Sequence, residues 1–373
     1  MERRDFVRKA ALTAAGGGLL SACGAAEEAP AGAPGVQTRR NVRWRLISSY
    51  PRSLDALYGV VDGLAARVAA LTGDRFQIRG YPAGELVPPN EVLTAVQNGT
   101  VQMGHSAAYY YVGKNPAFAF DTCVPFGLTA RQQNAWLYRG GGLELMRELY
   151  ADFNIVNFPG GNTGAQMGGW FRREINSLAD LRGLKMRIPG LGGEVMDALG
   201  VTPQLLPGGE LYPALERGAI DAVEWVGPYD DEKLGLHQIA PYYYYPGWWE
   251  PGPTVSFMIN RQAWEGLPPE YQEVLATAAA EMNQQMLATY DARNQEAFVR
   301  LIDGGARLRR FPDDVMRAAE QQSFDIMERR AAADAAYRKV YEAFKQWRDA
   351  SLRWFGTNEH AYAAYVYRDA GPA

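Results

Sequence analysis

Three consecutive segments decide the fold: NVRWRLIS (41–48), LDALYGVVDGLAARVAAL (54–71) and FQIRGY (76–81). The first and third have the composition of strands, whereas the second has apolar residues at helical spacing and ends at Thr72-Gly73. A helix (91–97) and a strand (101–105) continue this order. Alternation of strands and helices predicts an α/β fold in which helices pack on a mostly parallel sheet.

A repeated turn further along the chain favours two related lobes. The segments LTAVQNGTVQM (93–103) and YPALERGAIDA (212–222) both read as a helix end, a glycine and a short buried strand. Gly99 and Gly218 stand where a helix can end in a left-handed conformation. Two such lobes would face each other across a cleft. The same turn is also the commonest helix-to-strand connection, so it does not by itself require two lobes.

The C-terminal third is predicted to be helical. From 270 to about 302 there is neither proline nor glycine, which predicts one helix of about 50 Å at 1.5 Å per residue, long enough to brace both lobes. Two more helices are expected, roughly to Arg330 and from Asp334 to Trp354. The last carries an aromatic stripe that requires either a partner chain or the protein's own body to cover it: Tyr337, Tyr341, Phe344 and Trp347.

The first residues read as an export signal. Arg3-Arg4 precedes a short apolar run, which is typical of a twin-arginine signal and too short to span a bilayer. Leu20-Ser21-Ala22-Cys23 is similar to a bacterial lipoprotein cleavage motif, which predicts cleavage before Cys23 and lipid attachment to it. Residues 23–40, rich in Ala, Gly, Glu and Pro, are expected to form a flexible tether.

Composition and motifs exclude several function classes. With 38 basic and 42 acidic residues interleaved along the chain, nucleic-acid binding is not expected. Two cysteines cannot build a disulfide framework, and three scattered histidines lack the spacing of metal ligands. Phosphate-binding, nucleophile-elbow and zinc-protease motifs are absent from the sequence. Cys123 lies in an apolar segment without a nearby histidine, so a small buried side chain is expected there, not a nucleophile.

Four polar clusters are the candidate site. In GNTGAQMGGW (161–170), Asn162 and Gln166 offer amide groups among glycines that allow close approach of a small ligand. Arg187 ends an apolar strand, where an arginine forms either a structural ion pair or a two-pronged clamp for a carboxylate. Glu224 also ends an apolar strand, beside Trp225, and Glu250 follows two tryptophans.

Taken together, residues 41 to about 350 resemble the solute-binding proteins of tripartite ATP-independent periplasmic (TRAP) transporters, especially the 2-oxoacid-binding type. The quoted motifs that carry the resemblance are YPAGELV (81–87), GHSAAYYY (104–111), GNTGAQMGGW (161–170), LRGLKMRIPG (181–190), IDAVEWVGPY (220–229) and YPGWWEPG (245–252). The LKMR strand is shared across TRAP binding proteins, whereas the segments containing Glu224 and Glu250 are typical of the 2-oxoacid branch.

The resemblance implies two α/β lobes that close over a small organic acid anion, which is delivered to the membrane permease subunits without chemical change. Arg187 would pair with the ligand carboxylate, and Asn162 with Tyr109 or Tyr110 would reach its other oxygens. Na⁺ or Ca²⁺ would bridge protein and ligand, held by Gln166, Glu224, the Trp225 carbonyl and Glu250. Trp225 would also border the ligand. The branch further implies a homodimer formed by exchange of C-terminal helices.

The expected division of the chain is a signal (1–22), the tether (23–40), a first lobe (41–160 and about 255–310), a second lobe (161–254) and C-terminal helices (311–373). Three other functions remain open at this point. The ligand could be lactate or another 2-hydroxyacid. An exported hydrolase could use Glu224 and Glu250 as paired carboxylates. A lipoprotein scaffold could present the C-terminal helices, although it would leave Arg187 unexplained.

Overall fold

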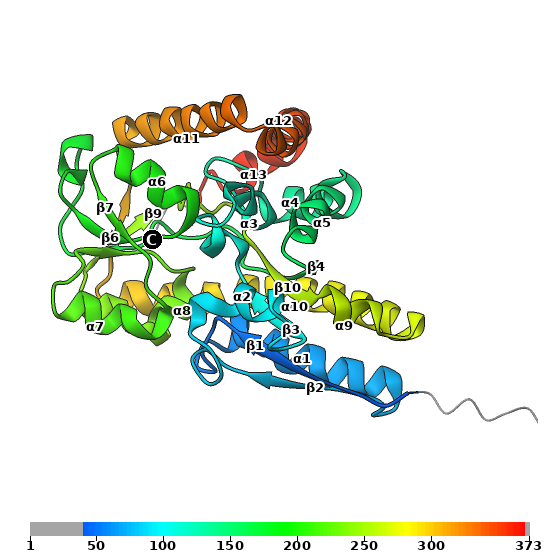
Figure 1. Ribbon diagram of the computed structural model, residues 1–373. Helices are drawn as coiled ribbons and strands as arrows, with labels where there is room; N and C mark the ends of the chain where they lie inside the picture. Colours follow the sequence, from blue (N-terminus) through cyan, green and yellow to red (C-terminus); the bar gives the residue numbers. More distant parts are fainter. Residues whose placement is uncertain (1–39, 370–373) are drawn as a thin grey trace, which may run out of the picture. The chain divides into compact units, whose positions relative to one another are not determined.

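The computed structural model describes residues 40–369 (Figure 1). The expected export signal, Cys23 and the tether up to residue 39 lie outside the described residues. Within the described part, the chain builds two β-sheets with helices on them. This arrangement confirms the predicted α/β class.

The first sheet contains five strands in the order β2-β1-β3-β10-β4. They are β1 (Val42–Ser48), β2 (Phe76–Tyr81), β3 (Met103–Ser106), β4 (Ile155–Asn162) and β10 (Thr254–Asn260). Helix α1 (Asp55–Thr72) connects β1 to its parallel neighbour β2 and buries its apolar side, including Leu57, Val61, Leu64 and Val68. The predicted strand, helix and second strand are therefore confirmed.

The second sheet contains six strands in the order β11-β9-β5-β8-β6-β7. They are β5 (Trp170–Phe171), β6 (Lys185–Arg187), β7 (Thr202–Gln204), β8 (Ala222–Val223), β9 (Tyr242–Tyr245) and β11 (Arg307–Arg310). Strand β11 pairs with β9 in this sheet, although the expected division placed its residues in the first lobe.

Each sheet contains one strand that runs against both of its neighbours, so the sheets are mixed and the expected mostly parallel pairing holds only in part. In the first sheet this strand is β10, and in the second it is β5. Both are the first strand after the chain crosses from one sheet to the other, β5 after β4 and β10 after β9. Strand β11 also follows a strand of the other sheet but runs parallel to β9, so a crossing does not by itself set the direction of a strand.

The repeated turn has the predicted geometry in both lobes. Gly99 and Gly218 each have φ of 70°, after the helices α2 (Val92–Gln97) and α7 (Leu211–Glu216) and before β3 and β8. A left-handed glycine therefore ends the equivalent helix in each lobe. The other short helices are α3 (Ala119–Thr122), α4 (Ala130–Arg139), α5 (Gly142–Ala151), α6 (Gly190–Ala198), α8 (Pro228–Leu234), α9 (Arg261–Glu265) and α13 (Ala361–Val366).

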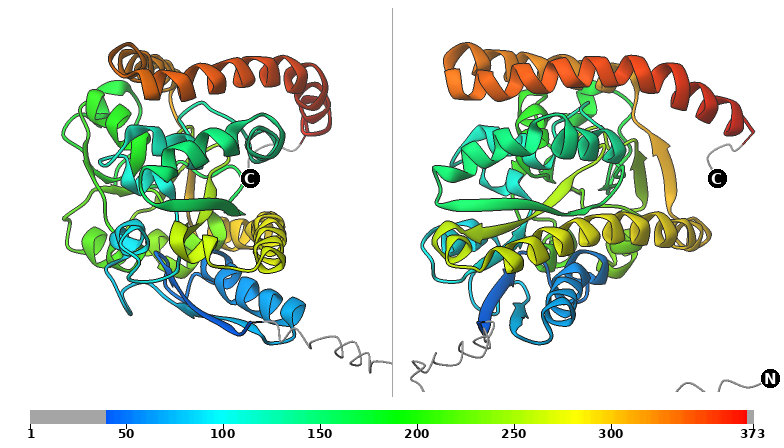
Figure 2. Two further views of the ribbon diagram at one scale, coloured as in Figure 1. Left: turned by 45° about the vertical axis from the view of Figure 1, so that its right-hand side comes forward. Right: turned by 90° about the vertical axis from the view of Figure 1, so that its right-hand side faces the viewer.

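The predicted long helix is α10 (Pro269–Asp303), with 35 residues. It packs against α1 and β4 of the first lobe and against α8 of the second, and Figure 2 shows it running alongside both. Its interior lacks helix breakers, so nothing interrupts its hydrogen-bond ladder across the two lobes. The prediction of a helix that braces both lobes is confirmed.

The last long helices, α11 (Asp313–Ala333) and α12 (Ala335–Phe355), lie together over one side of the two sheets (Figure 2). Tyr337, Tyr341 and Phe344 are 3%, 4% and 2% exposed. Their rings pack on Phe120, with the Phe344 ring also 5.3 Å from the Trp136 ring between centroids. Of the two coverings considered for this stripe, the structure shows the protein's own body.

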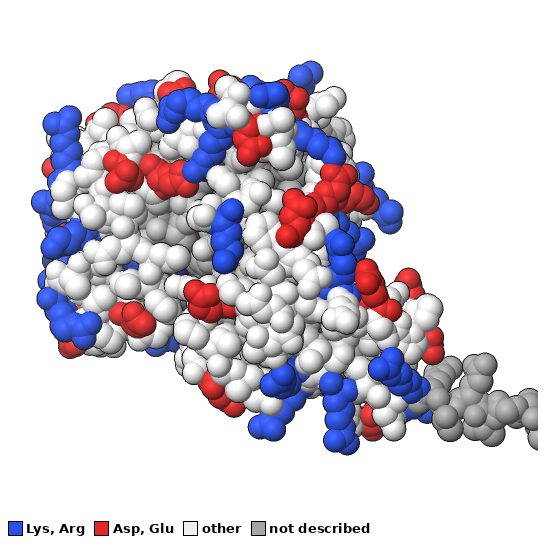
Figure 3. Space-filling model, in the orientation of Figure 1, with Lys and Arg blue, Asp and Glu red and all other residues white. Residues whose placement is uncertain are grey.

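Charged residues of both signs alternate over the face drawn in Figure 3. This distribution gives that face no basic field for a polyanion. Among residues 40–369, no helix is both long enough and apolar enough to span a bilayer.

Candidate functional site

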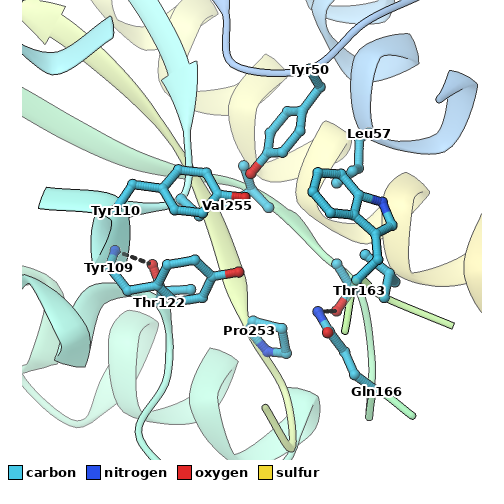
Figure 4. A pocket seen from close by; sticks show the side chains of 12 residues that line it. Tyr50, Leu57, Tyr109, Tyr110, Thr122, Thr163, Gln166, Pro253 and Val255 are labelled. Atoms are coloured by element: carbon cyan, nitrogen blue, oxygen red, sulfur yellow. Dashed lines mark hydrogen bonds between the residues drawn. The ribbon is translucent and has the colours of Figure 1, made fainter. Parts of the chain in front are cut away.

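A small cavity of about 10 Å³ lies where the two lobes meet. Figure 4 shows the hydroxyl groups of Tyr50, Tyr109 and Tyr110 pointing into it. Its twelve lining residues are Tyr50, Leu57, Ala107, Tyr109, Tyr110, Thr122, Thr163, Gln166, Trp225, Val226, Pro253 and Val255. The cavity is therefore mostly apolar and aromatic, with a few convergent polar groups, as is common for small-molecule sites.

The topology explains why these residues meet. Tyr50 follows β1, Tyr109 follows β3 and Trp225 follows β8, so each stands at the carboxyl end of a parallel-paired strand, where α/β sheets bind ligands. Thr163 and Gln166 lie on the crossing from β4 to β5, while Pro253 lies on the return crossing to β10. Both lobes and both crossings therefore contribute to the cavity wall.

Arg187, the last residue of β6, is buried next to the lining residue Trp225 with 1% exposure. Its Nη1 donates to the Glu224 carboxylate and to the Glu224 carbonyl at 2.9 Å, while Nε donates to the Leu206 carbonyl at 3.1 Å. Its guanidinium carbon lies 4.8 Å from the centroid of the Trp225 ring, within cation–π range. Burial opposes its charge, but Glu224 together with Tyr110, Tyr109 and Glu250 outweighs burial and raises the pKa of Arg187 above its usual value.

Two buried carboxylates share this one cation. Glu224 and Glu250 are 0% and 3% exposed. Burial raises the pKa of Glu224 to about 7 in spite of Arg187, and burial together with the charge of Glu224 raises the pKa of Glu250 well above its usual value. Tyr109 donates its hydroxyl to Glu250 Oε2 at 3.2 Å. The site therefore has two acidic groups for one basic group, and burial favours protonation of these acids unless a further cation stabilises their ionised forms.

Two oxygen atoms in this group have no hydrogen-bond partner within the described residues. They are Gln166 Oε1 and Glu224 Oε2, both buried. The Gln166 side chain is oriented by its own Nε2, which donates to Thr163 Oγ1 at 3.1 Å, and its backbone nitrogen donates to the Glu250 carbonyl at 3.1 Å. Carboxylate and amide oxygens are the ligands of hard cations such as Na⁺ and Ca²⁺. Among residues 40–369, no group of three or more His, Cys, Asp and Glu side chains has metal-site spacing, and the expected set contains only two acids.

Asn162 forms hydrogen bonds on both sides of its amide. Its Nδ2 donates to the Gly252 carbonyl at 3.0 Å, and its Oδ1 accepts from the Gly164 backbone nitrogen at 2.9 Å. These bonds join the two crossings between the lobes, and Asn162 does not line the cavity. In this structure its amide therefore connects the two crossings.

Cys123 packs with Ala107 and Tyr109 and is 5% exposed. Burial raises the pKa of its thiol well above the usual value, with smaller contributions from Glu250 and Glu224. The expectation of a small buried side chain at this position is confirmed.

Sequence reasoning found Tyr109, Tyr110, Gln166 and Trp225 but missed the other residues that line the cavity. Of these, Tyr50 carried a usable signal, because it lies two residues after the first predicted strand, at its carboxyl end. Apolar residues such as Leu57 and Val255 carry no signal of this kind, since their side chains resemble those of the core.

Comparison with known proteins identifies the family. Residues 47–334 match the DctP family, described as bacterial extracellular solute-binding protein family 7. The monocarboxylate 2-oxoacid-binding periplasmic protein of Nostoc sp. is 54% identical over 367 residues, covering 98% of this chain and 99% of the relative.

Solved structures show the same fold. A TRAP transporter solute-binding protein from Bordetella bronchiseptica, a dimer with copurified calcium and picolinate in one site, has 48% identity and a TM-score of 0.88, covering 89% of this chain and 99% of the other. A TRAP solute-binding protein from Colwellia psychrerythraea, with bound calcium and pyruvate, has 39% identity and a TM-score of 0.85, covering 87% of this chain and 100% of the other. A TRAP solute-binding protein from Pseudoalteromonas atlantica, with bound sodium and pyruvate, has 40% identity and a TM-score of 0.85, covering 87% of this chain and 99% of the other. This family transports solutes, so the predicted binding protein is confirmed in preference to the hydrolase. The chain belongs to the DctP family of periplasmic TRAP solute-binding proteins.

Proposed function

We propose that this protein binds a small 2-oxo monocarboxylate, such as pyruvate or a larger 2-oxoacid, together with Na⁺ or Ca²⁺, and delivers it to the TRAP permease. The observation that carries the proposal is one buried arginine facing two buried carboxylates beside a small cavity shared by both lobes. The relatives that bind pyruvate or other 2-oxoacids support the choice of ligand class.

Charge explains why a cation belongs in the site. Arg187 with ionised Glu224 and Glu250 has a net charge of −1, and a monocarboxylate would make it −2. Such a charge is costly away from water. The unpartnered oxygens of Gln166 and Glu224 fit a hard cation, with the Trp225 carbonyl and Glu250 completing the proposed set. When bound, the cation would supply positive charge and coordinate ligand oxygens.

The protein's own residues would then hold the acid. The planar guanidinium of Arg187 is suited to a two-pronged bond with the ligand carboxylate, which would replace part of its contact with Glu224. The hydroxyl groups of Tyr109 and Tyr110 would donate to the remaining oxygens. Leu57 and Val255 would face the alkyl end of the ligand and exclude water from it. The cavity of about 10 Å³ has room for about one water molecule, so the two lobes would have to separate to admit the acid and again to release it.

Calorimetry against a panel of short acids tests the proposal. We expect 2-oxoacids to bind more tightly than acetate or propionate, and every ligand to be recovered unchanged. If lactate bound more tightly than all 2-oxoacids, the 2-hydroxyacid alternative would replace this ligand class. If none of the acids bound in the presence of either cation, the proposal would fail.

We also propose twin-arginine export and lipid attachment at Cys23. The support is the sequence alone, namely Arg3-Arg4 before a short apolar run and the Leu20–Cys23 motif. Mass spectrometry of the membrane fraction should find a lipid-modified N-terminal Cys23. A chain that remains soluble and unmodified after export, and that behaves identically when Cys23→Ser is introduced, would contradict the lipid anchor.

We finally propose a homodimer, using a surface different from the aromatic stripe. The exposed apolar residues at the end of the chain are Leu352, Trp354, Tyr362, Tyr365, Val366 and Tyr367, with exposed fractions from 40% to 70%. A patch of this kind is typical of an interface, and one structural relative is a dimer. Light scattering should give a dimer for the intact chain and a monomer for a chain ending at Phe355. An intact chain that stays monomeric at micromolar concentration would contradict the dimer.

A further inference from the structure

The cavity wall at Trp225 is held from behind by a carboxylate that does not face the cavity. Asp230, on α8, is 0% exposed. Its Oδ2 accepts a hydrogen bond from Trp225 Nε1 at 3.3 Å and another from the Tyr290 hydroxyl at 2.8 Å. Its Oδ1 has no partner within residues 40–369. The tryptophan indole and a tyrosine hydroxyl therefore share one buried oxygen.

The other contacts of Trp225 confine its ring between two side chains and the backbone. The Arg187 guanidinium covers one face at 4.8 Å, and the Tyr50 ring packs edge-on with centroids 6.4 Å apart. A Cβ atom at Gly208 would lie 2.9 Å from the ring, so the indole packs directly on the backbone there. Asp230 is the group that selects the rotation of the ring, because the indole N–H is a donor only.

Asp230 also connects the cavity wall to the long helix α10, because Tyr290 lies on that helix. Two other buried aspartates accept a tyrosine hydroxyl without holding a cavity-lining side chain. Asp231 accepts from Tyr243 and Trp170, and Asp121 accepts from Tyr150. Among these three, only Asp230 hydrogen-bonds a side chain that lines the cavity.

We infer that Asp230 is a positioning residue for the ligand site: it fixes the Trp225 indole as a wall of the cavity and thereby sets both the affinity and the chain-length selectivity for the acid. This inference rests on the proposed function for its ligand. A buried indole N–H without an acceptor is costly, so without Asp230 the ring turns toward another acceptor. The wall between Arg187 and Tyr50 then changes shape.

The test compares single-atom changes at matched tyrosines. Tyr290→Phe removes a hydroxyl from Asp230, and Tyr150→Phe removes one from Asp121. Both tyrosines are 0% exposed, and both donate to a fully buried aspartate. Kd is measured by calorimetry for pyruvate and for 2-oxopentanoate in calcium buffer, with melting temperature measured in parallel.

Both substitutions should lower the melting temperature, but only Tyr290→Phe should raise Kd, by about 3-fold, because Asp230 then loses one of the two hydrogen bonds that hold its carboxylate in place behind Trp225. Asp230→Ala should raise Kd by about 10-fold or more and bring the two acids closer in affinity, since the indole loses its acceptor. Asp230→Asn, which keeps an acceptor oxygen, should restore much of the affinity. Folded Tyr290→Phe and Asp230→Ala proteins with wild-type Kd values and selectivity would overturn the inference.

A second measurement needs no ligand. In protein labelled with ¹⁵N-tryptophan, the Trp225 indole resonance is assigned by its loss in Trp225→Phe. Tyr290→Phe and Asp230→Asn should shift this resonance, whereas Tyr150→Phe should not. A resonance that stays unmoved in both Tyr290→Phe and Asp230→Asn would overturn the positioning role, even if Asp230→Ala fails to fold. If the wild-type protein bound neither acid, the proposed function would fail, whereas this resonance would still decide the role of Asp230.

Discussion

Replacing Arg187 by lysine keeps a positive charge but removes the planar guanidinium. The arginine donates through Nε to Leu206 and through Nη1 to the Glu224 carbonyl and carboxylate. A single ammonium group cannot keep these directions and also bind a ligand carboxylate with two parallel bonds. We therefore expect the loss of one or two hydrogen bonds to charged groups, at about 1.5–3 kcal/mol each.

This loss corresponds to a weakening of about 2–5 kcal/mol in binding free energy, or roughly 30-fold to several thousand-fold in Kd. The assay is calorimetric titration with pyruvate in the presence of Ca²⁺, with the melting temperature recorded for each variant. Arg309→Lys is the matched control, because Arg309 pairs with Glu174 at 2.6 Å on the exposed edge of the second sheet. It should leave Kd unchanged. A folded Arg187→Lys protein with wild-type affinity would refute the carboxylate clamp.

Arg187→Ala is the harsher variant. It leaves Glu224 buried without its cation, which typically costs about 3–5 kcal/mol of folding free energy. Loss of binding in that variant would therefore report on the clamp only if its melting transition remained cooperative and above the assay temperature.

Three further predictions concern stability and closure. Burial raises the pKa of Asp121 from 3.8 to about 6, and its hydrogen-bond partners are all neutral side chains. Protonated Asp121 therefore stabilises the folded state fully below about pH 4, and this contribution of about 3 kcal/mol is lost as the pH rises through 6. Urea unfolding of Asp121→Asn should lack this pH dependence, and parallel pH profiles for both proteins would contradict it. The Asp55 carboxylate on α1 accepts hydrogen bonds from Lys233 and Tyr229 on α8, and these bonds join the two lobes. Asp55→Asn should therefore speed ligand release by roughly 2–5-fold in stopped flow, with less effect in high salt. An unchanged release rate would show that this contact does not hold the lobes closed. A Cβ at Gly252 would lie 2.2 Å from the Ala130 nitrogen, so Gly252→Ala should lower the free energy of unfolding by about 1–3 kcal/mol, and unchanged stability would show that the crossing can move.

Local patterns predicted most of the fold. The strand, helix and strand from residue 41 to 81, the left-handed glycines at 99 and 218 and the unbroken helix α10 each depend on neighbouring residues in the sequence. The antiparallel direction of β5 and β10 depends instead on the path of the chain between the two sheets, and no local pattern contains that information. Burial of the stripe on α12 likewise depends on Phe120 and Trp136, which lie far away in the sequence.

The candidate site was predictable only where its residues are chemically unusual for their setting. A lone arginine at the end of an apolar strand and acids beside tryptophans stand out, and the structure brings Arg187, Glu224 and Trp225 together. Asn162 stood out equally but holds backbone groups of the two crossings. A polar side chain among glycines can satisfy a turn or a ligand, and only the geometry distinguishes these roles.

The most direct test of the account is pyruvate binding by the wild-type protein and by Glu224→Gln after removal of cations by chelation and dialysis, repeated after addition of Ca²⁺ or Na⁺. The account predicts that at least one cation tightens wild-type binding by about 10-fold or more, that Glu224→Gln loses much of this gain because a hard ion loses an anionic ligand, and that pyruvate is recovered unchanged. Identical wild-type titrations with and without both cations, or consumption of the pyruvate, would contradict it.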